Sequence, residues 1–212
     1  MQQGDRRLLV PLALLAVGAF LFALVSLDVA EGGLLARLDP HIAGWSFEHV
    51  TGAAHTVCAW ITWLGSSRVL AAFVLFGMAW LMYRRRFADA LALGVGAAVA
   101  ALLTVVFKDA FRRARPAFVD PHELPHSFSF PSGHASGAFT VYLLLAIVLT
   151  ATLPSQRRLL AVLCGLTLAV VIAATRVLLP VHYLTDVVAG ACLGLAVVGG
   201  TLLVRNLAAV RG

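Results

Sequence analysis

The sequence is dominated by long apolar runs that are separated by short charged groups. The first run, Leu8 to Leu27, contains no charged residue, and its length of about 20 residues is enough for a helix to cross the hydrocarbon core of a bilayer. Hydrophobic residues make up 61% of the 212 residues and charged residues 12%, against roughly 25% charged in soluble domains. The chain is therefore expected to be an integral membrane protein.

The apolar runs predict an all-α fold, a bundle of six transmembrane helices that forms a single membrane domain over residues 1–212. A cleaved signal peptide is the alternative for the first run, because Arg6 and Arg7 precede it, but no small-x-small cleavage site follows. We therefore expect a retained span. The six expected spans cover residues 8–27, 69–83, 90–107, 132–153, 159–175 and 182–204.

The segment 28–67 alternates charged and apolar residues, and Trp45, Trp60 and Trp63 suit the membrane–water interface. It is expected to form one or two short helices on the extracytoplasmic surface. A role as a connector and a role as a lid over a site are both compatible with it. A second alternative is that residues 50–67 cross the membrane, which would change the number of spans.

The positions of lysine and arginine indicate how the chain lies in the membrane. With the N-terminus in the cytoplasm, Arg6, Arg7, the triplet 84–86, Arg157 and Arg158 face the cytoplasm. Four basic residues between Lys108 and Arg115 then face outward, against this trend, which indicates a chemical role. The net charge of +6 therefore reflects membrane orientation and does not predict nucleic acid as a partner.

Three polar groups interrupt the apolar sequence between residues 108 and 186. They are Lys108 to Pro116, Pro131 to His134, and Thr175 to Asp186. Two spans, one in each direction, lie between the first group and the third. All three groups are therefore expected on the same membrane face, whichever number of spans is correct.

The second group begins an apolar helix. Ser132 is a favourable N-cap residue, and Gly133 permits close approach of the backbone. Free N–H groups at a helix start bind anions, assisted by the helix dipole. His134 in the first turn would then point toward the bound anion, although a capped helix start without function fits the same residues.

The third group places His182 and Asp186 four residues apart, which on a helix puts them on one face. A carboxylate bound to one imidazole nitrogen leaves the other nitrogen as a nucleophile or base. Arg176 can reach the same site, and a purely structural pair between Arg176 and Asp186 is the alternative. Gly190 and Gly194 continue this face as a stripe for close helix packing.

The first group supplies cations. A spacing of seven residues predicts that Lys108 and Arg115 share one helical face, and both side chains suit phosphate binding. Arg112 and Arg113 are expected to face lipid headgroups or solvent. Together the three groups provide cations, a helix N-terminus, two histidines and a carboxylate, which fits phosphoryl transfer without a metal or other cofactor.

The motifs Lys-x6-Arg-Pro, Pro-Ser-Gly-His and Arg-x5-His-x3-Asp, in this order, resemble those of the type 2 phosphatidic acid phosphatase superfamily. That superfamily includes bacterial phosphatidylglycerophosphate and undecaprenyl pyrophosphate phosphatases, glucose-6-phosphatase and vanadium haloperoxidases. The motifs extend from Lys108 to Asp186, and six spans resemble the membrane branch. Thr175 stands where the family motif usually has serine, and it retains the hydroxyl.

The resemblance implies a role for each motif residue. His182 would attack phosphorus to form a phosphohistidine, Asp186 would orient it, and His134 would protonate the leaving oxygen and then activate water. His122 and His126 match no motif position. The residues that would hold the phosphoryl group are Lys108, Arg115, Ser132, Gly133 and Arg176.

The resulting expectation is a multi-pass lipid phosphate phosphatase of the plasma (inner) membrane, with its active site on the extracytoplasmic face and a lipid phosphate as its substrate. A lipid phosphotransferase with the same site, a non-enzymatic transporter and a haloperoxidase are the alternatives. The resemblance leaves phosphatidic acid, phosphatidylglycerol phosphate and undecaprenyl pyrophosphate as substrates, with preference for the last two. It does not predict the oligomeric state.

Overall fold

A computed structural model of the chain describes residues 3–118 and 127–211. His122 and His126 lie outside the described residues. Within the described ranges the secondary structure is entirely helical, as the sequence predicts. The helices are α1 (Gln3–Glu31), α2 (Leu34–His49), α3 (Gly52–Trp63), α4 (Ser67–Tyr83), α5 (Phe87–Phe111), α6 (Gly133–Leu149), α7 (Ser155–Leu178) and α8 (Leu184–Arg211).

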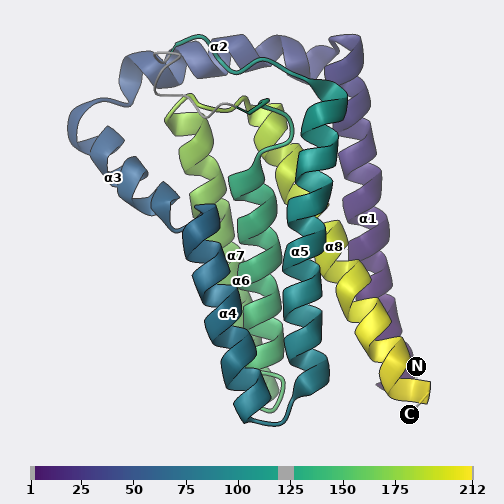
Figure 1. The fold of residues 1–212 in the computed structure, drawn as a ribbon. Helices are drawn as coiled ribbons and strands as arrows, with labels where there is room; N and C mark the ends of the chain where they lie inside the picture. The colour runs from purple at the N-terminus through teal and green to yellow at the C-terminus, as the bar shows by residue number, and fades with distance from the viewer. Residues whose placement is uncertain (1–2, 119–126, 212) are drawn as a thin grey trace.

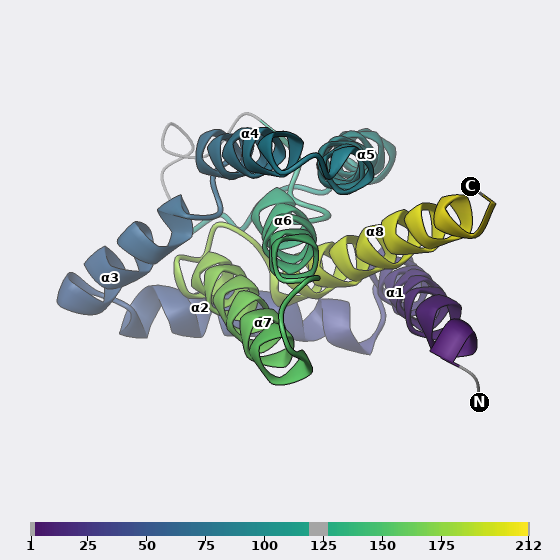
Figure 2. The same cartoon turned by 90° about the horizontal axis from the view of Figure 1, so that it is seen from below.

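Helix α6 forms the centre of the bundle, with α4 and α5 on one side of it and α7 and α8 on the other (Figures 1 and 2). Its residues are apolar around most of its circumference, and most of them are buried, as expected of a core helix. Five stretches of the described chain are long and apolar enough to cross a membrane, and α6 is a shorter apolar helix of 17 residues. The expected six-helix membrane bundle is confirmed.

Helices α1 and α8 pack against each other over most of their lengths, at one side of the bundle (Figure 1). Close approach of the two backbones requires residues without side chains. A Cβ atom at Gly18 would lie 2.6 Å from the backbone nitrogen of Ala196. The glycines therefore allow two highly apolar helices to pack tightly, as small residues do at helix interfaces in membranes.

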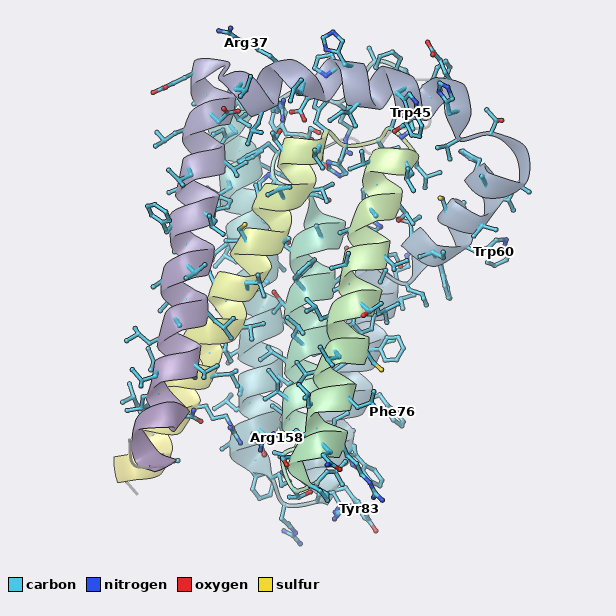
Figure 3. The ribbon with its side chains drawn as sticks, turned by 180° about the vertical axis from the view of Figure 1, so that it is seen from behind. Arg37, Trp45, Trp60, Phe76, Tyr83 and Arg158 are labelled. Carbon is cyan, nitrogen blue, oxygen red and sulfur yellow. The ribbon has the colours of Figure 1, made fainter. Side chains whose placement is uncertain are left out.

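Helix α2 lies across one end of the bundle, and α3 then descends at the side toward the start of α4 (Figure 1). The expected surface helix in the segment 28–67 is therefore present as α2. Helix α3 does not cross the membrane by itself, because α3 and α4 together form a single candidate span, Gly52–Tyr83. Trp60 and Trp63 on α3 are exposed, as is Trp45 on α2 (Figure 3).

The opposite end of the bundle carries the arginine-rich turns, with Arg158 and Tyr83 at this end (Figure 3). Asp89 on α5 forms ion pairs of 2.5 Å with both Arg86 and Arg205. Arg86 also donates a hydrogen bond of 2.6 Å to the carbonyl of Val148 at the end of α6. These contacts connect α5, α6 and α8 at the end of the bundle that lies away from α2.

Helix α8 packs its glycine stripe, which the sequence predicts to be a helix-packing face, against the beginning of α6. A Cβ atom at Gly190 would lie 2.5 Å from the carbonyl oxygen of Ser132, and one at Gly194 would lie 2.8 Å from the carbonyl oxygen of Ser136. Backbone atoms cannot move aside as a flexible side chain does. The two glycines therefore fix the separation between α8 and the Ser132–His134 turn.

Substitution of Gly190 by alanine is expected to destabilise the protein by about 1–3 kcal/mol, because the added methyl group overpacks the helix interface. Gly200→Ala is the matched control on the same helix, since a Cβ atom there would lie 3.7 Å from Leu15, an ordinary contact. Thermal unfolding in detergent compares the two variants. An unfolding midpoint for Gly190→Ala equal to that of Gly200→Ala would contradict the packing argument.

Candidate active site

A cavity of about 650 Å³ lies at the α2 end of the bundle and extends along α4, α5 and α6. Its lower part is apolar, with side chains such as Leu70, Val74 and Val105. Its upper part brings together residues from all three motif groups. The predicted site residues that line it are Lys108, Arg115, Gly133, His134, Arg176 and His182, whereas Ser132 and Asp186 lie outside its lining.

His182 lies in the turn between α7 and α8 and is 2% exposed. The expectation that it shares a helical face with Asp186 is wrong in its detail, because α8 begins at Leu184. The two side chains nevertheless meet, with 3.4 Å between Nδ1 of His182 and Oδ2 of Asp186. The His182 backbone N–H donates to the carbonyl of Arg176 at 3.2 Å, which fixes the turn.

The contacts of the His182 ring determine which nitrogen faces the cavity. Its Nδ1 lies 3.3 Å from the hydroxyl of Ser129, beside Asp186, and its Nε2 lies 3.1 Å from an N–H of Arg115. A proton on Nδ1 satisfies these partners and leaves the lone pair on Nε2. Burial, with smaller effects of Arg115 and Arg176, lowers the pKa of His182 to about 3, although Asp186 opposes this shift. The ring is therefore neutral at pH 7 and can act as a nucleophile.

Asp186 is fully buried in the first turn of α8. Its Oδ2 accepts from the backbone N–H of Tyr183 at 2.9 Å, which satisfies a donor at the helix start. Its Oδ1 accepts from Arg113 at 2.7 Å. The alternative structural pair with Arg176 is therefore wrong, as is the expectation that Arg113 faces lipid or solvent. A buried carboxylate requires a cation, and Arg113 supplies it.

Lys108 and Arg115 reach the cavity by different routes. Helix α5 ends at Phe111, and Arg112 adopts a left-handed conformation with φ of 46°, so Arg115 does not share a helical face with Lys108 as expected. Lys108 donates to the carbonyls of Phe128 and Ser129. Arg115 donates to the carbonyl of Val181 at 2.8 Å. Both cations are thus held at the rim, above the buried helix ends.

Arg176 lies in the last turn of α7 and is buried. One terminal N–H donates to the hydroxyl of Thr62 on α3 at 2.7 Å. Its Nε is buried and has no hydrogen-bond partner among the described residues. A buried guanidinium with an unsatisfied N–H, beside a cavity, is suited to accept an anionic ligand.

The start of α6 has the geometry expected of an anion-binding element. Ser132 is the N-cap, and its hydroxyl accepts from the backbone N–H of Ala135. The Ser132 backbone N–H donates to the carbonyl of Asp186 at 2.9 Å, so the first turns of α6 and α8 are directly hydrogen-bonded to each other. The Gly133 and His134 amides, which no described hydrogen bond occupies, line up with the helix dipole toward the cavity.

Several residues of this arrangement were not found from the sequence. Ser129 donates to Oδ2 of Asp186 and contacts His182, and Thr62 holds Arg176. Serine and threonine are common in loops and helices, and neither position has a distinguishing spacing. The described residues also contain no group of three or more His, Cys, Asp or Glu side chains close enough to hold a metal.

The arrangement can bind a phosphoryl group and attack it. Three cations and a helix N-terminus surround one end of the cavity, and a neutral imidazole held by a carboxylate opens into it. His134 lines the same cavity and can transfer a proton. The apolar remainder of the cavity can hold hydrocarbon. These properties together fit phosphoryl transfer from an amphipathic molecule.

Comparison with known proteins agrees with this geometry. The sequence model of the PAP2 superfamily matches residues 89–208. Phosphatidylglycerophosphatase B of Bacillus subtilis (strain 168) is 36% identical over 155 residues, which cover 71% of each chain. Decaprenylphosphoryl-5-phosphoribose phosphatase of Mycobacterium tuberculosis is 34% identical over 116 residues, which cover 53% of this chain and 59% of that protein.

Two solved structures resemble the fold. The crystal structure of a transmembrane PAP2-type phosphatidylglycerolphosphate phosphatase from Bacillus subtilis matches with a TM-score of 0.76 and 29% identity, covering 90% of this chain and 93% of that one. LpxE of Aquifex aeolicus has the same fold, with a TM-score of 0.54 and 22% identity over 82% and 96% of the two chains. The chain therefore belongs to the PAP2 superfamily, in its branch of membrane lipid phosphatases.

Proposed function

We propose that this membrane lipid phosphatase removes the terminal phosphate of a lipid phosphate through a phosphohistidine on His182. The observation that carries the proposal is the shared cavity, in which the cations, His134 and His182 meet at the end of an apolar channel. A lipid placed there has its phosphate among the cations and its hydrocarbon beside α4 and α5. The site thus fits both parts of the substrate.

The reaction proceeds in two steps. Nε2 of His182 attacks phosphorus, the bond from phosphorus to the lipid oxygen breaks, and His134 gives that oxygen a proton. Water then attacks the phosphohistidine and passes a proton to His134, and inorganic phosphate leaves. Lys108, Arg115 and Arg176 stabilise charge on the phosphoryl oxygens in both steps. A terminal nitrogen of Arg115 lies 3.1 Å from Nε2 of His182, and this contact must be replaced by the phosphoryl group before Nε2 attacks.

Phosphatidylglycerol phosphate is the proposed substrate. The support comes from the Bacillus subtilis relative named phosphatidylglycerophosphatase B, which aligns over 71% of this chain, and from the apolar length of the cavity. Polyprenyl lipids that end in a phosphate are the second candidate, favoured by the similarity to decaprenylphosphoryl-5-phosphoribose phosphatase. Undecaprenyl pyrophosphate belongs to this second class, and its phosphate would occupy the same position.

The site is proposed to face the extracytoplasmic side of a plasma membrane. The support is the placement of basic residues, because Arg158 and Tyr83, which directly precedes the arginine triplet 84–86, lie at the end of the bundle opposite α2 (Figure 3). Positive loops remain on the cytoplasmic side. Phosphate release by proteoliposomes of known orientation, supplied with substrate from one side only, distinguishes the two faces.

The purified protein is expected to release inorganic phosphate from phosphatidylglycerol phosphate, phosphatidic acid and undecaprenyl pyrophosphate in detergent with EDTA present. We expect phosphatidylglycerol phosphate to give the highest kcat/KM. Glycerol 3-phosphate is the control for the hydrocarbon, and its kcat/KM should be at least about 100-fold lower because tail burial contributes to binding. Absence of release from all three lipids, or release that requires added metal, would contradict the proposal.

The same samples separate a phosphatase from a phosphotransferase. In water enriched in oxygen-18, hydrolysis of the phosphohistidine places one labelled oxygen in each released phosphate. Transfer to an alcohol instead yields a new phosphate ester without that label. Mass spectrometry of the products therefore identifies the acceptor, and a predominance of the ester would favour the phosphotransferase.

A further inference from the structure

Asp39 is a buried carboxylate on a helix that lies at the surface of the bundle. Helix α2 exposes much of its length, including Leu34, Trp45 and Phe47, yet Asp39 is only 1% exposed. Glu48, on the same helix, is exposed. Removing a carboxylate from water is costly unless cations and hydrogen bonds replace the water. The contacts of Asp39 therefore indicate what this residue does.

Asp39 binds the start of α8. Its Oδ1 accepts from the backbone N–H of Thr185 at 3.1 Å, and its Oδ2 accepts from the Thr185 hydroxyl. An N–H in the first turn of a helix has no partner within the helix, so Asp39 caps α8 from another element. Thr185 is adjacent to Asp186, and the cap therefore lies directly behind the residue that orients His182.

Arg113 connects Asp39 to Asp186. One terminal nitrogen of its guanidinium donates to Oδ1 of Asp186 and the other donates to Oδ2 of Asp39, both at 2.7 Å. The guanidinium also lies over the ring of Tyr183, 4.4 Å from its centroid. Burial alone would lower the pKa of Arg113, but Asp186 and Asp39 outweigh it and raise that pKa. The cation is thus permanent and held in one orientation.

The result is a chain of four groups, Asp39–Arg113–Asp186–His182, in which each group fixes the next. Arg113 holds Oδ1 of Asp186, which leaves Oδ2 facing Ser129 and Nδ1 of His182. A free carboxylate rotates about its last bond and alternates its oxygens. With Asp39 and Arg113 in place, this rotation is blocked and the imidazole has one orientation.

We propose that Asp39, acting through Arg113, is a positioning residue for the His182–Asp186 pair, and that α2 is docked onto the bundle to supply it. The inference rests on the proposed phosphatase reaction. Asp39 and Arg113 are not among the residues that line the cavity. Their loss should therefore slow formation of the phosphohistidine while leaving phosphate binding nearly unchanged.

The test uses the full-length protein in detergent with phosphatidylglycerol phosphate. For Asp39→Asn, kcat and the rapid-quench rate of phosphoenzyme formation should fall about 10-fold, with KM within about twofold, because orientation is lost and binding is retained. For Arg113→Met the fall should be about 100-fold. Glu48→Gln is the matched control, an exposed acid on the same helix, and should behave as wild type.

A non-additive double variant distinguishes positioning from general weakening of the fold. In an Arg113→Met background, Asp39→Asn should lower kcat by less than about a further twofold, because Asp39 acts through Arg113. Arg113→Lys retains the charge and should restore part of the rate, which provides the same test if Arg113→Met unfolds. Wild-type kcat in Asp39→Asn, a loss confined to KM, or additive effects would overturn the inference. An inactive wild-type protein would instead overturn the proposed function.

Discussion

Replacement of His182 by alanine is expected to reduce phosphate release from the lipid substrate by at least about 10,000-fold, because no other described side chain occupies the position of the nucleophile. The wild-type protein, quenched in alkali during turnover, should carry an acid-labile and alkali-stable phosphate on His182. The variant should carry none. Quenched-flow measurement with a labelled terminal phosphate and mass spectrometry of the peptide follow both results.

His182→Gly offers a stricter form of this experiment. The missing ring leaves a space beside Asp186 and Ser129, and added imidazole should enter it and restore part of the phosphate release. His49→Ala is the matched control, because His49 is an exposed histidine on α2 and its loss should leave the rate unchanged. Undiminished turnover in His182→Ala, or phosphate trapped on another residue, would contradict the mechanism.

Replacement of His134 by alanine is expected to reduce turnover of the lipid substrate by about 1,000-fold, since a general acid contributes about 100- to 10,000-fold. The deficit should depend on the leaving group. With p-nitrophenyl phosphate, whose phenolate leaves without a proton, the first step should recover and give a burst of nitrophenol. The phosphoenzyme should then accumulate, because activation of water still requires His134.

Stopped-flow absorbance resolves the burst from the steady state. The burst amplitude should approach one nitrophenol per active site in His134→Ala and should be absent in the His134→Ala, His182→Ala double variant. Equal deficits with the lipid and the aryl ester would show that His134 has another task, such as holding the phosphoryl group.

The bundle was predictable because each apolar run carries its own evidence. A run of about 20 apolar residues without a charge is long enough to cross the hydrocarbon core, and as a single span in lipid it must be helical. The residues at which the helices end were harder to predict. Helix α5 continues to Phe111, four residues beyond the expected end of the span at Phe107, and stops at Arg112 in a left-handed conformation. Arginine carries no signal for that conformation, which glycine or asparagine normally provides.

The sequence predicts the contact between His182 and Asp186, but the structure produces it in a different way. A spacing of four suggested a shared helical face, whereas His182 precedes α8 and Asp186 lies in its first turn. The carboxylate accepts the N–H of Tyr183, which turns the chain back and brings the imidazole to it. Helix capping thus produces the proximity that the helical periodicity predicts.

The roles of Arg113 and Asp39 could not be assigned from the sequence, because these roles depend on contacts between residues that are far apart in the chain. Three of the four residues 112–115 are arginines, and nothing in their order distinguishes Arg113, which binds Asp186, from its neighbours. Asp39 lies in a segment that mixes charged and apolar residues, and its spacing from them has no distinguishing pattern. Its partners, Arg113 and Thr185, are 74 and 146 residues away, and only the folded chain brings them together.

The length of α6 bears on how deep in the bilayer the phosphate is cleaved. Its 17 residues extend over roughly 26 Å at about 1.5 Å per residue, less than the roughly 30 Å of hydrocarbon in a typical bilayer. If its far end is placed at the opposite boundary, α6 would begin below the level of the surrounding headgroups. We therefore expect the lipid phosphate to move toward the bilayer centre before cleavage, and the thickness of the host membrane to set part of the energy of that movement.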